Sequence, residues 1–350
     1  MSNWRHHSPN PFSFTMTQNS IPNHLSSAFD ELDGELIGPV QLLLSSSTDD
    51  RLVGVVNLQH LCDEQSIPFL IHALSDECED VVFTAVTSLW EIAHQDAVTP
   101  LLGCLSSASS DRVRKEALNA LKELVNQDHL LLILDRLVTD DVPQQLSLLI
   151  LLRKIHDVQA LPSVAPFLSS ENADLRRESV TTLRYLNQLT HFPPALKLAS
   201  DPDLEVRKET MLTMAHLDEP DVIKILTASL SNDSSWQVRR NAAQALERKC
   251  DPYSAAFLAN SIRDEHWQVR KFSLRALNPL VLNEHLPYIL PLLCDEYSDV
   301  RKEAALALGG ILLDQSKAAL QQILDDSDIE VRIAAQKSLA KFQSELNPTK

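Results

Sequence analysis

Residues 299–308 read Asp-Val-Arg-Lys-Glu-Ala-Ala-Leu-Ala-Leu, and this pattern decides the fold because it returns along almost the whole chain. An apolar residue usually precedes the Arg, a small residue usually follows it at the third position, and a Leu or Met follows it at the seventh. The pattern recurs every 31 or 32 residues, and the Arg positions are Arg51, Arg114, Arg176, Arg207, Arg239, Arg270, Arg301 and Arg332. Two further slots of this spacing hold Val82 and Gln145, so about ten units cover nearly everything after residue 36.

A repeat of this length predicts one elongated solenoid, in which each unit buries its apolar face against its neighbours. In the unit around Arg114, Val113, Ala117, Leu121 and Leu124 share one stripe at spacings of three and four, which predicts a first helix over residues 111–125. A second helix is predicted over residues 129–137. The small-residue position holds Leu148 in the unit of Gln145, where we expect a bend or a buried contact.

The predicted solenoid spans residues 23–346 as a single domain with an N-terminal helical cap. Residues 1–22 contain three Pro and no helical period, so we expect a disordered tail there. Residues 347–350 form a short C-terminal tail.

The overall charge of −17 argues against nucleic-acid binding, which depends on clustered Lys and Arg. No apolar run approaches the ~20 residues of a membrane span, so membrane insertion is not expected. The five Cys are scattered and never form a C-x-x-C pair, which favours reduced thiols in a cytoplasmic protein.

The repeated V-R-x-x-A-x-x-A-L helix is followed by a second helix of the A-l-P-x-L kind, as in Ala160-Leu161-Pro162 and His285-Leu286-Pro287. Over about residues 36–344 the chain resembles the HEAT-repeat proteins of the short phycobilisome-lyase-like (E/Z-type) class. The resemblance implies an all-α, armadillo-like fold: a right-handed α-α superhelix of about ten two-helix repeats, with the second helices lining the concave face. That class includes scaffolds, bilin lyases, chaperones of bilin proteins and an iron hydroxylase.

The Arg positions have a structural interpretation. An Asp recurs five residues before the apolar position of most units, and a repeat rise of ~10 Å would let an Arg reach the Asp of the next inter-repeat turn. We expect a ladder of such pairs that includes Arg114, Arg176, Arg207, Arg332, Asp201, Asp233, Asp264, Asp295 and Asp326. The alternative is a groove in which some guanidinium groups remain free to bind carboxylates.

The C-terminal half holds the candidate patch for a partner or ligand. Trp236 and Trp267 occupy the same slot of successive units, and Tyr297 lies one residue from that slot in the next. Aromatic and Arg side chains are favoured at binding hot spots, and the other members of this patch are Arg239, Arg240, His266, Arg270, Lys271 and Arg301. The competing interpretation is that each Trp packs over the helix end of its neighbouring repeat.

The function favoured by these observations is a protein-binding scaffold, adaptor or chaperone-like factor without a cofactor, whose partner carries basic patches that complement the acidic chain. The alternative is a bilin lyase or phycobiliprotein maturation factor, in which Arg side chains would hold the propionates and aromatic rings would cover the pyrroles. A phycobiliprotein subunit would then be the partner. No residue is assigned as catalytic.

A di-iron hydroxylase is rejected, and no metal site is expected. The hydroxylase branch holds its iron pair with His-Glu dipeptides, whereas this chain has only the reverse order, in Glu265-His266 and Glu284-His285. Reversal moves each ligand by ~100° around a helix.

Overall fold

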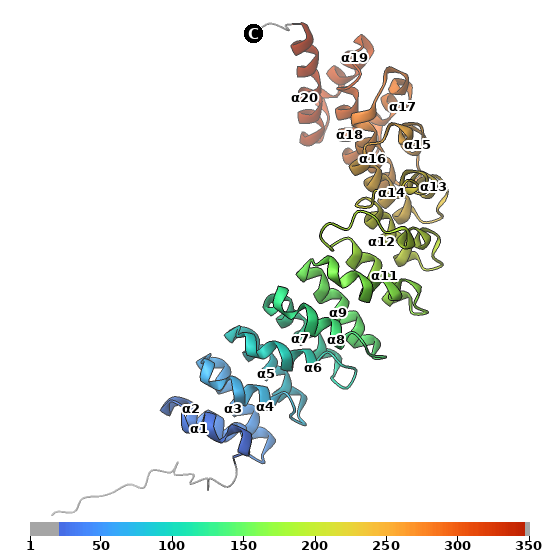
Figure 1. Ribbon diagram of the computed structural model, residues 1–350. Helices are drawn as coiled ribbons and strands as arrows, with labels where there is room; N and C mark the ends of the chain where they lie inside the picture. Colours follow the sequence, from blue (N-terminus) through green and yellow to red (C-terminus); the bar gives the residue numbers. More distant parts are fainter. Residues whose placement is uncertain (1–20, 347–350) are drawn as a thin grey trace, which may run out of the picture. The chain divides into compact units, whose positions relative to one another are not determined.

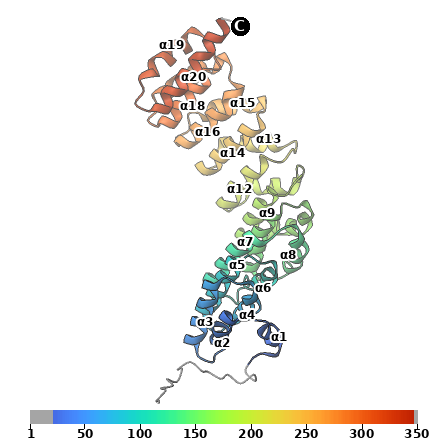
Figure 2. The same ribbon diagram turned by 90° about the vertical axis from the view of Figure 1, so that its left-hand side faces the viewer.

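The computed structural model describes residues 21–346, so the predicted C-terminal tail and nearly all of the predicted N-terminal tail lie outside the described residues. Every regular element within residues 21–346 is a helix (Figures 1 and 2). The prediction of an all-α repeat fold is confirmed. The described chain divides into two compact units after Ile155, and the single continuous solenoid over 23–346 stays a prediction.

The first unit begins with the short helices of the predicted cap and continues through four first helices, the first three of which are followed by their second helices within the unit. The cap consists of η2 (Asn23–Leu25), α1 (Ser26–Asp30) and α2 (Gly34–Leu43). The first helices of the repeats are α3 (Thr48–Leu61), α5 (Glu79–Ile92), α7 (Asp111–Leu124) and α9 (Val142–Ile155). The second-helix layer consists of η3 (Glu64–Ser66), α4 (Ile67–Ala73), η4 (Gln95–Ala97), α6 (Val98–Gly103), η5 (Gln127–His129) and α8 (Leu130–Arg136).

The second unit repeats the same arrangement, with more of its second helices in 3₁₀ form. Its first helices are α11 (Ala173–Leu183), α12 (Leu204–Met214), α14 (Trp236–Lys249), α16 (Trp267–Leu277), α18 (Ser298–Leu308) and α20 (Ile329–Leu346). The other layer consists of η6 (Val158–Ala160), α10 (Leu161–Val164), η7 (Ala165–Ser169), η8 (Pro193–Ser200), α13 (Val222–Asn232), η9 (Pro252–Ser254), α15 (Ala255–Ser261), η10 (Asn278–Leu280), η11 (Asn283–His285), α17 (Leu286–Ile289), η12 (Leu290–Cys294), α19 (Asp314–Gln322) and η13 (Ile323–Asp325).

The two helices of each repeat bury a shared core because their apolar residues recur at helical spacing. In α7 the predicted stripe of Val113, Ala117, Leu121 and Leu124 is buried. Leu148, the misfit of the small-residue position, is fully buried in α9. Figure 1 shows the first helices of each unit in one row and the second helices in another.

Short polar side chains cap several of the first helices. Asn172 accepts hydrogen bonds from the backbone N–H groups of Asp174 and Leu175, and Asp203 does the same for Glu205 and Val206. These caps satisfy donors that have no partner inside the helix. The turn residues that separate these units in the sequence therefore also set where the first helix starts.

Gly54 allows α2 and α3 to pack backbone against backbone. A Cβ atom at this position would lie 2.4 Å from the backbone nitrogen of Leu43 and 2.7 Å from the carbonyl oxygen of Pro39. Both are main-chain atoms that cannot rotate away. Only glycine fits this contact between the cap and the first repeat.

We predict that Gly54→Ala destabilises the first unit by about 1–3 kcal/mol, because overpacking must push α2 away from α3. Gly38→Ala is the matched control. Gly38 lies inside α2, and a Cβ atom added there would meet no atom within 4 Å. Alanine at this position should therefore increase the stability by about 0.5–1 kcal/mol through its higher helix propensity. Urea unfolding followed by circular dichroism measures both, and equal effects of the two substitutions would contradict the packing argument.

Candidate functional site

Six Arg side chains each bridge two consecutive inter-repeat turns. Arg176 is typical: its Nε and Nη2 donate to the two carboxylate oxygens of Asp201 at 2.8 Å each, and its Nη1 donates to the carbonyl oxygens of Ser170 and Glu171. We call the set the Arg–Asp ladder, and its pairs are Arg51–Asp76, Arg176–Asp201, Arg207–Asp233, Arg239–Asp264, Arg270–Asp295 and Arg301–Asp326. One guanidinium thus ties together the turns on both sides of a repeat.

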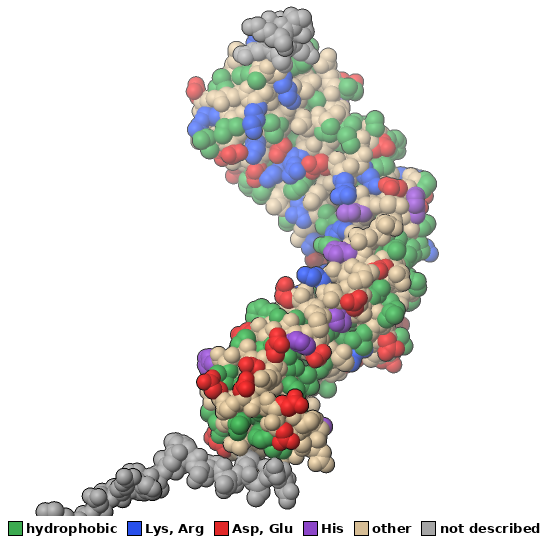
Figure 3. Space-filling view, turned by 60° about the vertical axis from the view of Figure 1, so that its left-hand side comes forward, with side chains coloured by type: hydrophobic (Ala, Val, Ile, Leu, Met, Phe, Trp, Pro, Cys, Tyr) green, Lys and Arg blue, Asp and Glu red, His purple; other side chains and the backbone are tan. Residues whose placement is uncertain are grey.

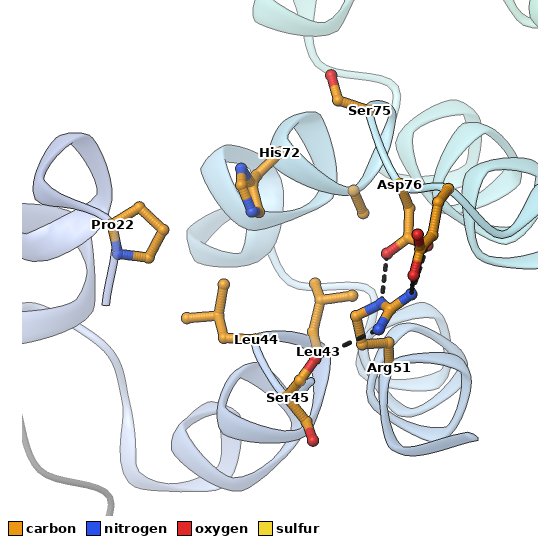
Figure 4. Close-up of a pocket in the computed structure, with 10 residues that line it drawn as sticks. Pro22, Leu43, Leu44, Ser45, Arg51, His72, Ser75 and Asp76 are labelled. Atoms are coloured by element: carbon orange, nitrogen blue, oxygen red, sulfur yellow. Dashed lines mark hydrogen bonds and ion pairs between the residues drawn. The ribbon is translucent and has the colours of Figure 1, made fainter. Parts of the chain in front are cut away.

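Figure 4 shows the first pair at a cavity of about 370 Å³ between the cap and the first repeat. Arg51 points at Asp76, and a dashed line joins its guanidinium to that carboxylate. Its Nη2 also donates to Glu77 at 3.3 Å. Burial opposes ionisation of Asp76, but the hydrogen bond from Arg51 and the backbone N–H of Cys78 outweigh it, so the pKa of Asp76 is lowered. The pocket is therefore closed on one side by a satisfied ion pair.

Two predicted members of the ladder lack an Asp of the next repeat. Arg114 bonds to Asp111 on its own helix and to the carbonyl oxygens of Ser106 and Ser109. Arg332 lies in the last repeat, and its described hydrogen bonds go to the carbonyl oxygens of Asp326 and Ser327. Arg114 lacks such a pair because Thr139 of the next turn occupies the position that Asp holds in the ladder pairs.

The alternative of guanidinium groups free for carboxylates is wrong for three residues of the candidate patch. Arg239, Arg270 and Arg301 each donate hydrogen bonds from Nε, Nη1 and Nη2 to acceptors of the ladder and its turns. Their side chains are only 10–15% exposed. These three side chains hold the turns, so contacts with a partner would have to come from the side chains around them.

The aromatic residues of the candidate patch form a row of nearly parallel rings, which we call the aromatic stack: Trp236, His266, Trp267 and Tyr297. The centroids of Trp236 and His266 are 3.7 Å apart with planes 7° from parallel, and those of Trp267 and Tyr297 are 5.0 Å apart at 12°. His266 and Trp267 join the two pairs at 6.4 Å and 18°. Tyr297 is 40% exposed.

The stack follows from where its residues stand on their helices. Each Trp is the first residue of its helix, α14 or α16, whereas His266 and Tyr297 are the N-cap residues of α16 and α18. The first ring of one repeat therefore meets the cap ring of the next. Tyr297 lies one residue before the Trp slot, at the same cap position as His266, and from there its ring contacts Trp267.

The ladder positions the cap rings directly. Asp264 accepts from Arg239 and also from the backbone N–H of His266 at 2.8 Å, and Asp295 does the same for Arg270 and Tyr297 at 3.0 Å. The Nδ1 atom of His266 accepts from the backbone N–H of Gln268, so the proton of the neutral ring is on Nε2. Burial lowers the pKa of His266, which favours this neutral ring.

The two remaining cations of the patch lie at different places. Lys271 is 5.9 Å from the ring centre of Trp267 and forms an ion pair with Asp299 at 3.0 Å, so it flanks the aromatic stack. Arg240 lies over Phe272 and donates to Asn241, away from the stack. Burial lowers the pKa of Arg240, and the charge of Glu209 opposes that shift.

The acidic charge is concentrated in the first unit. Residues 21–155 hold 21 Asp and Glu against 8 Lys and Arg, whereas residues 156–350 hold 27 against 22. On the face in Figure 3, acidic side chains dominate the first unit and Lys and Arg lie mainly on the second. The aromatic stack thus belongs to the unit with the more balanced charge.

The described residues lack two other kinds of feature. No helix among residues 21–346 is long and apolar enough to cross a membrane. The same part of the chain holds no cluster of three or more His, Cys, Asp or Glu side chains arranged for a metal ion.

The repeat geometry agrees with a sequence comparison. A family model of HEAT repeats matches residues 39–146, 161–247, 223–283 and 254–340, which together make up most of the chain. The chain belongs to the HEAT-repeat family. The matched model describes HEAT repeats in general, so the finer phycobilisome-lyase-like class stays a prediction. A search of curated proteins gave no match.

Solved structures show the same HEAT-repeat fold at low sequence identity. An engineered protein is 19% identical with a TM-score of 0.51, covering 89% of this chain and 100% of its own. Yeast importin-β (Kap95p) is 12% identical with a TM-score of 0.61, over 89% of this chain and 52% of its own, and its complex with Nup1 is 13% identical with a TM-score of 0.61, over 93% and 53%. This chain spans about half the length of importin-β.

We predict that Asp201→Asn costs about 2–4 kcal/mol of stability, because the amide group cannot replace a carboxylate facing a largely buried guanidinium. The side chains of Arg176 and Asp201 are 13% and 4% exposed. Asp80→Asn is the control, since Asp80 and Arg112 are 59% and 50% exposed and such surface pairs contribute ~1 kcal/mol or less. Thermal unfolding compares the two substitutions.

Asp201→Asn should also reduce how steeply the free energy of unfolding falls as the pH is lowered into the acid range. Burial opposes ionisation of Asp201, but Arg176 and the backbone N–H of Asp203 lower its pKa below the ordinary 3.8. Its contribution is therefore present above pH ~3.8 and is lost as the pH falls through the lowered folded-state value. A variant profile as steep as that of the wild type would show that the ladder does not govern acid unfolding.

Proposed function

We propose that this chain is a protein-binding scaffold whose partner docks along the aromatic stack. The continuous row of rings from α14 to α18 carries this proposal. Rigid aromatic side chains offer large contact area at low entropic cost, and such residues dominate binding hot spots. The sequence-based expectation that second helices line a concave binding face is kept as part of the proposal, as is a cytoplasmic location.

The surroundings of the stack favour a basic partner. Glu265 and Glu296 stand beside the cap rings and are exposed, and Asp299 faces Lys271. A Lys or Arg of the partner could lie on the exposed face of Tyr297 and pair with these carboxylates. The excess of acidic residues in the first unit would add long-range attraction to the same partner.

We predict that the double substitution Trp267→Ala and Tyr297→Ala weakens binding of the partner about 30-fold or more, since hot-spot residues contribute about 2 kcal/mol or more. The partner is first identified by affinity capture from the native host and then titrated as a purified protein by calorimetry. Trp90→Ala is the matched control, because Trp90 is 42% exposed on α5 of the other unit. Equal binding of the partner by both variants would rule out the stack as the docking site.

Bilin handling is the alternative function. Parallel rings could cover the pyrroles of a linear tetrapyrrole, but the Arg side chains expected to hold its propionates are engaged in the ladder. We therefore expect phycocyanobilin to keep its absorption spectrum when mixed with the purified protein. A red-shifted, stoichiometric complex that Trp267→Ala abolishes, or capture of phycobiliprotein subunits, would favour the alternative.

A further inference from the structure

The C-terminal unit also contains a recess, which lies far from the aromatic stack. It has a volume of about 720 Å³ and is formed by residues 184–190, residues 215–218 and the last turn of α14, with His156 at its side. We call it the loop pocket. Small-molecule sites commonly have volumes of ~300–1,000 Å³. The last turn and the first turn of α14 are separated by about 20 Å at 1.5 Å per residue, so the loop pocket and the stack are different sites.

The pocket lies where two short first helices precede a longer one. The first helices α11 and α12 have 11 residues each, whereas α14 has 14. The two shorter helices are followed by loops instead of a further turn. The longer α14 carries Arg248 and Lys249 in its last turn, and both side chains line the pocket.

Hydrogen bonds fix the loops that form the walls. His156, whose φ is 59°, donates from Nδ1 to the carbonyl oxygen of Tyr185 at 2.9 Å, and its own carbonyl oxygen accepts from the N–H of Asn187 at 3.1 Å. The N–H of Asp218 donates to the carbonyl oxygen of Thr190 at 2.7 Å and ties the two loops together. The pocket is therefore formed before any ligand binds.

The pocket has an excess of positive charge in an acidic protein. Arg184, Arg248 and Lys249 surround the half-buried His216, and burial together with these three cations lowers the pKa of its imidazole. Arg184 and Lys249 have acidic partners in the chain. Arg248 is exposed and has no hydrogen-bond or ion-pair partner among the side chains that the structure describes between residues 21 and 342.

We propose that the loop pocket binds a small anion through a phosphate or carboxylate group. Arg248 is the main contact, because its donors are unused, and a ring N–H of His216 supplies a second. The exposed ring of Tyr185 and the side-chain amides of Asn187 and Gln188 line the remaining space for the body of the ligand.

Calorimetric titration of the full chain with pyrophosphate and with citrate tests this proposal and distinguishes the two anion chemistries. Saturable binding of either is expected, weakening as salt is added. Arg248→Gln should weaken it about tenfold or more, because a hydrogen bond to a charged group is lost. In NMR titrations of the imidazole, the bound anion should raise the pKa of His216, since it neutralises the surrounding cations.

Arg263→Gln is the matched control. Arg263 lies over Tyr288 in the same unit and outside the pocket, so its loss makes the same change in net charge without touching the site. The proposal fails if neither anion binds saturably, or if Arg263→Gln weakens binding as much as Arg248→Gln. It is independent of partner docking, because Tyr297→Ala should leave anion binding unchanged.

Discussion

The bidentate pair between an Arg of one repeat and an Asp of the next turn is the interaction on which the rest of the structure depends. An Arg placed at the start of a first helix is partly withdrawn from water, and a carboxylate and two carbonyl oxygens compensate for the hydration that its guanidinium loses. The same Asp accepts the N–H of the residue that caps the next helix. In the repeats that carry this pair, one set of hydrogen bonds thus links successive turns and holds the backbone at the start of the following first helix.

The aromatic stack is a consequence of that arrangement. Because Asp264 and Asp295 hold the backbone of the cap residues, the rings of His266 and Tyr297 are held against the Trp residues that begin the preceding first helices. A generic structural device therefore produces, in three successive repeats, an ordered surface of rings. The Arg residues of the ladder hold this surface in place, and the rings and the nearby carboxylates are the groups that would contact a partner.

The two ends of α14 illustrate how a regular solenoid acquires distinct sites. Its first residue, Trp236, belongs to the stack, and its last turn carries two of the three cations of the loop pocket, Arg248 and Lys249. The aromatic stack depends on which residues occupy two positions of an otherwise regular repeat. The loop pocket depends on the loops that follow two short first helices and on the cations in the last turn of the longer α14. Substitution and length variation are thus separate routes to function in one fold.

The sequence by itself determined the helical repeat, its period, the buried stripe of each first helix and the two residue types of the Arg–Asp ladder, because these depend on spacing along the chain. It could not decide that Arg114 pairs with Asp111 of its own helix, or that Arg239, Arg270 and Arg301 are unavailable to a ligand. Those outcomes depend on which turn faces each guanidinium. The stacking of Trp267 on Tyr297 and the gathering of Arg184, Arg248 and His216 were likewise decided by tertiary structure, since residues about 30 apart meet only when successive repeats pack.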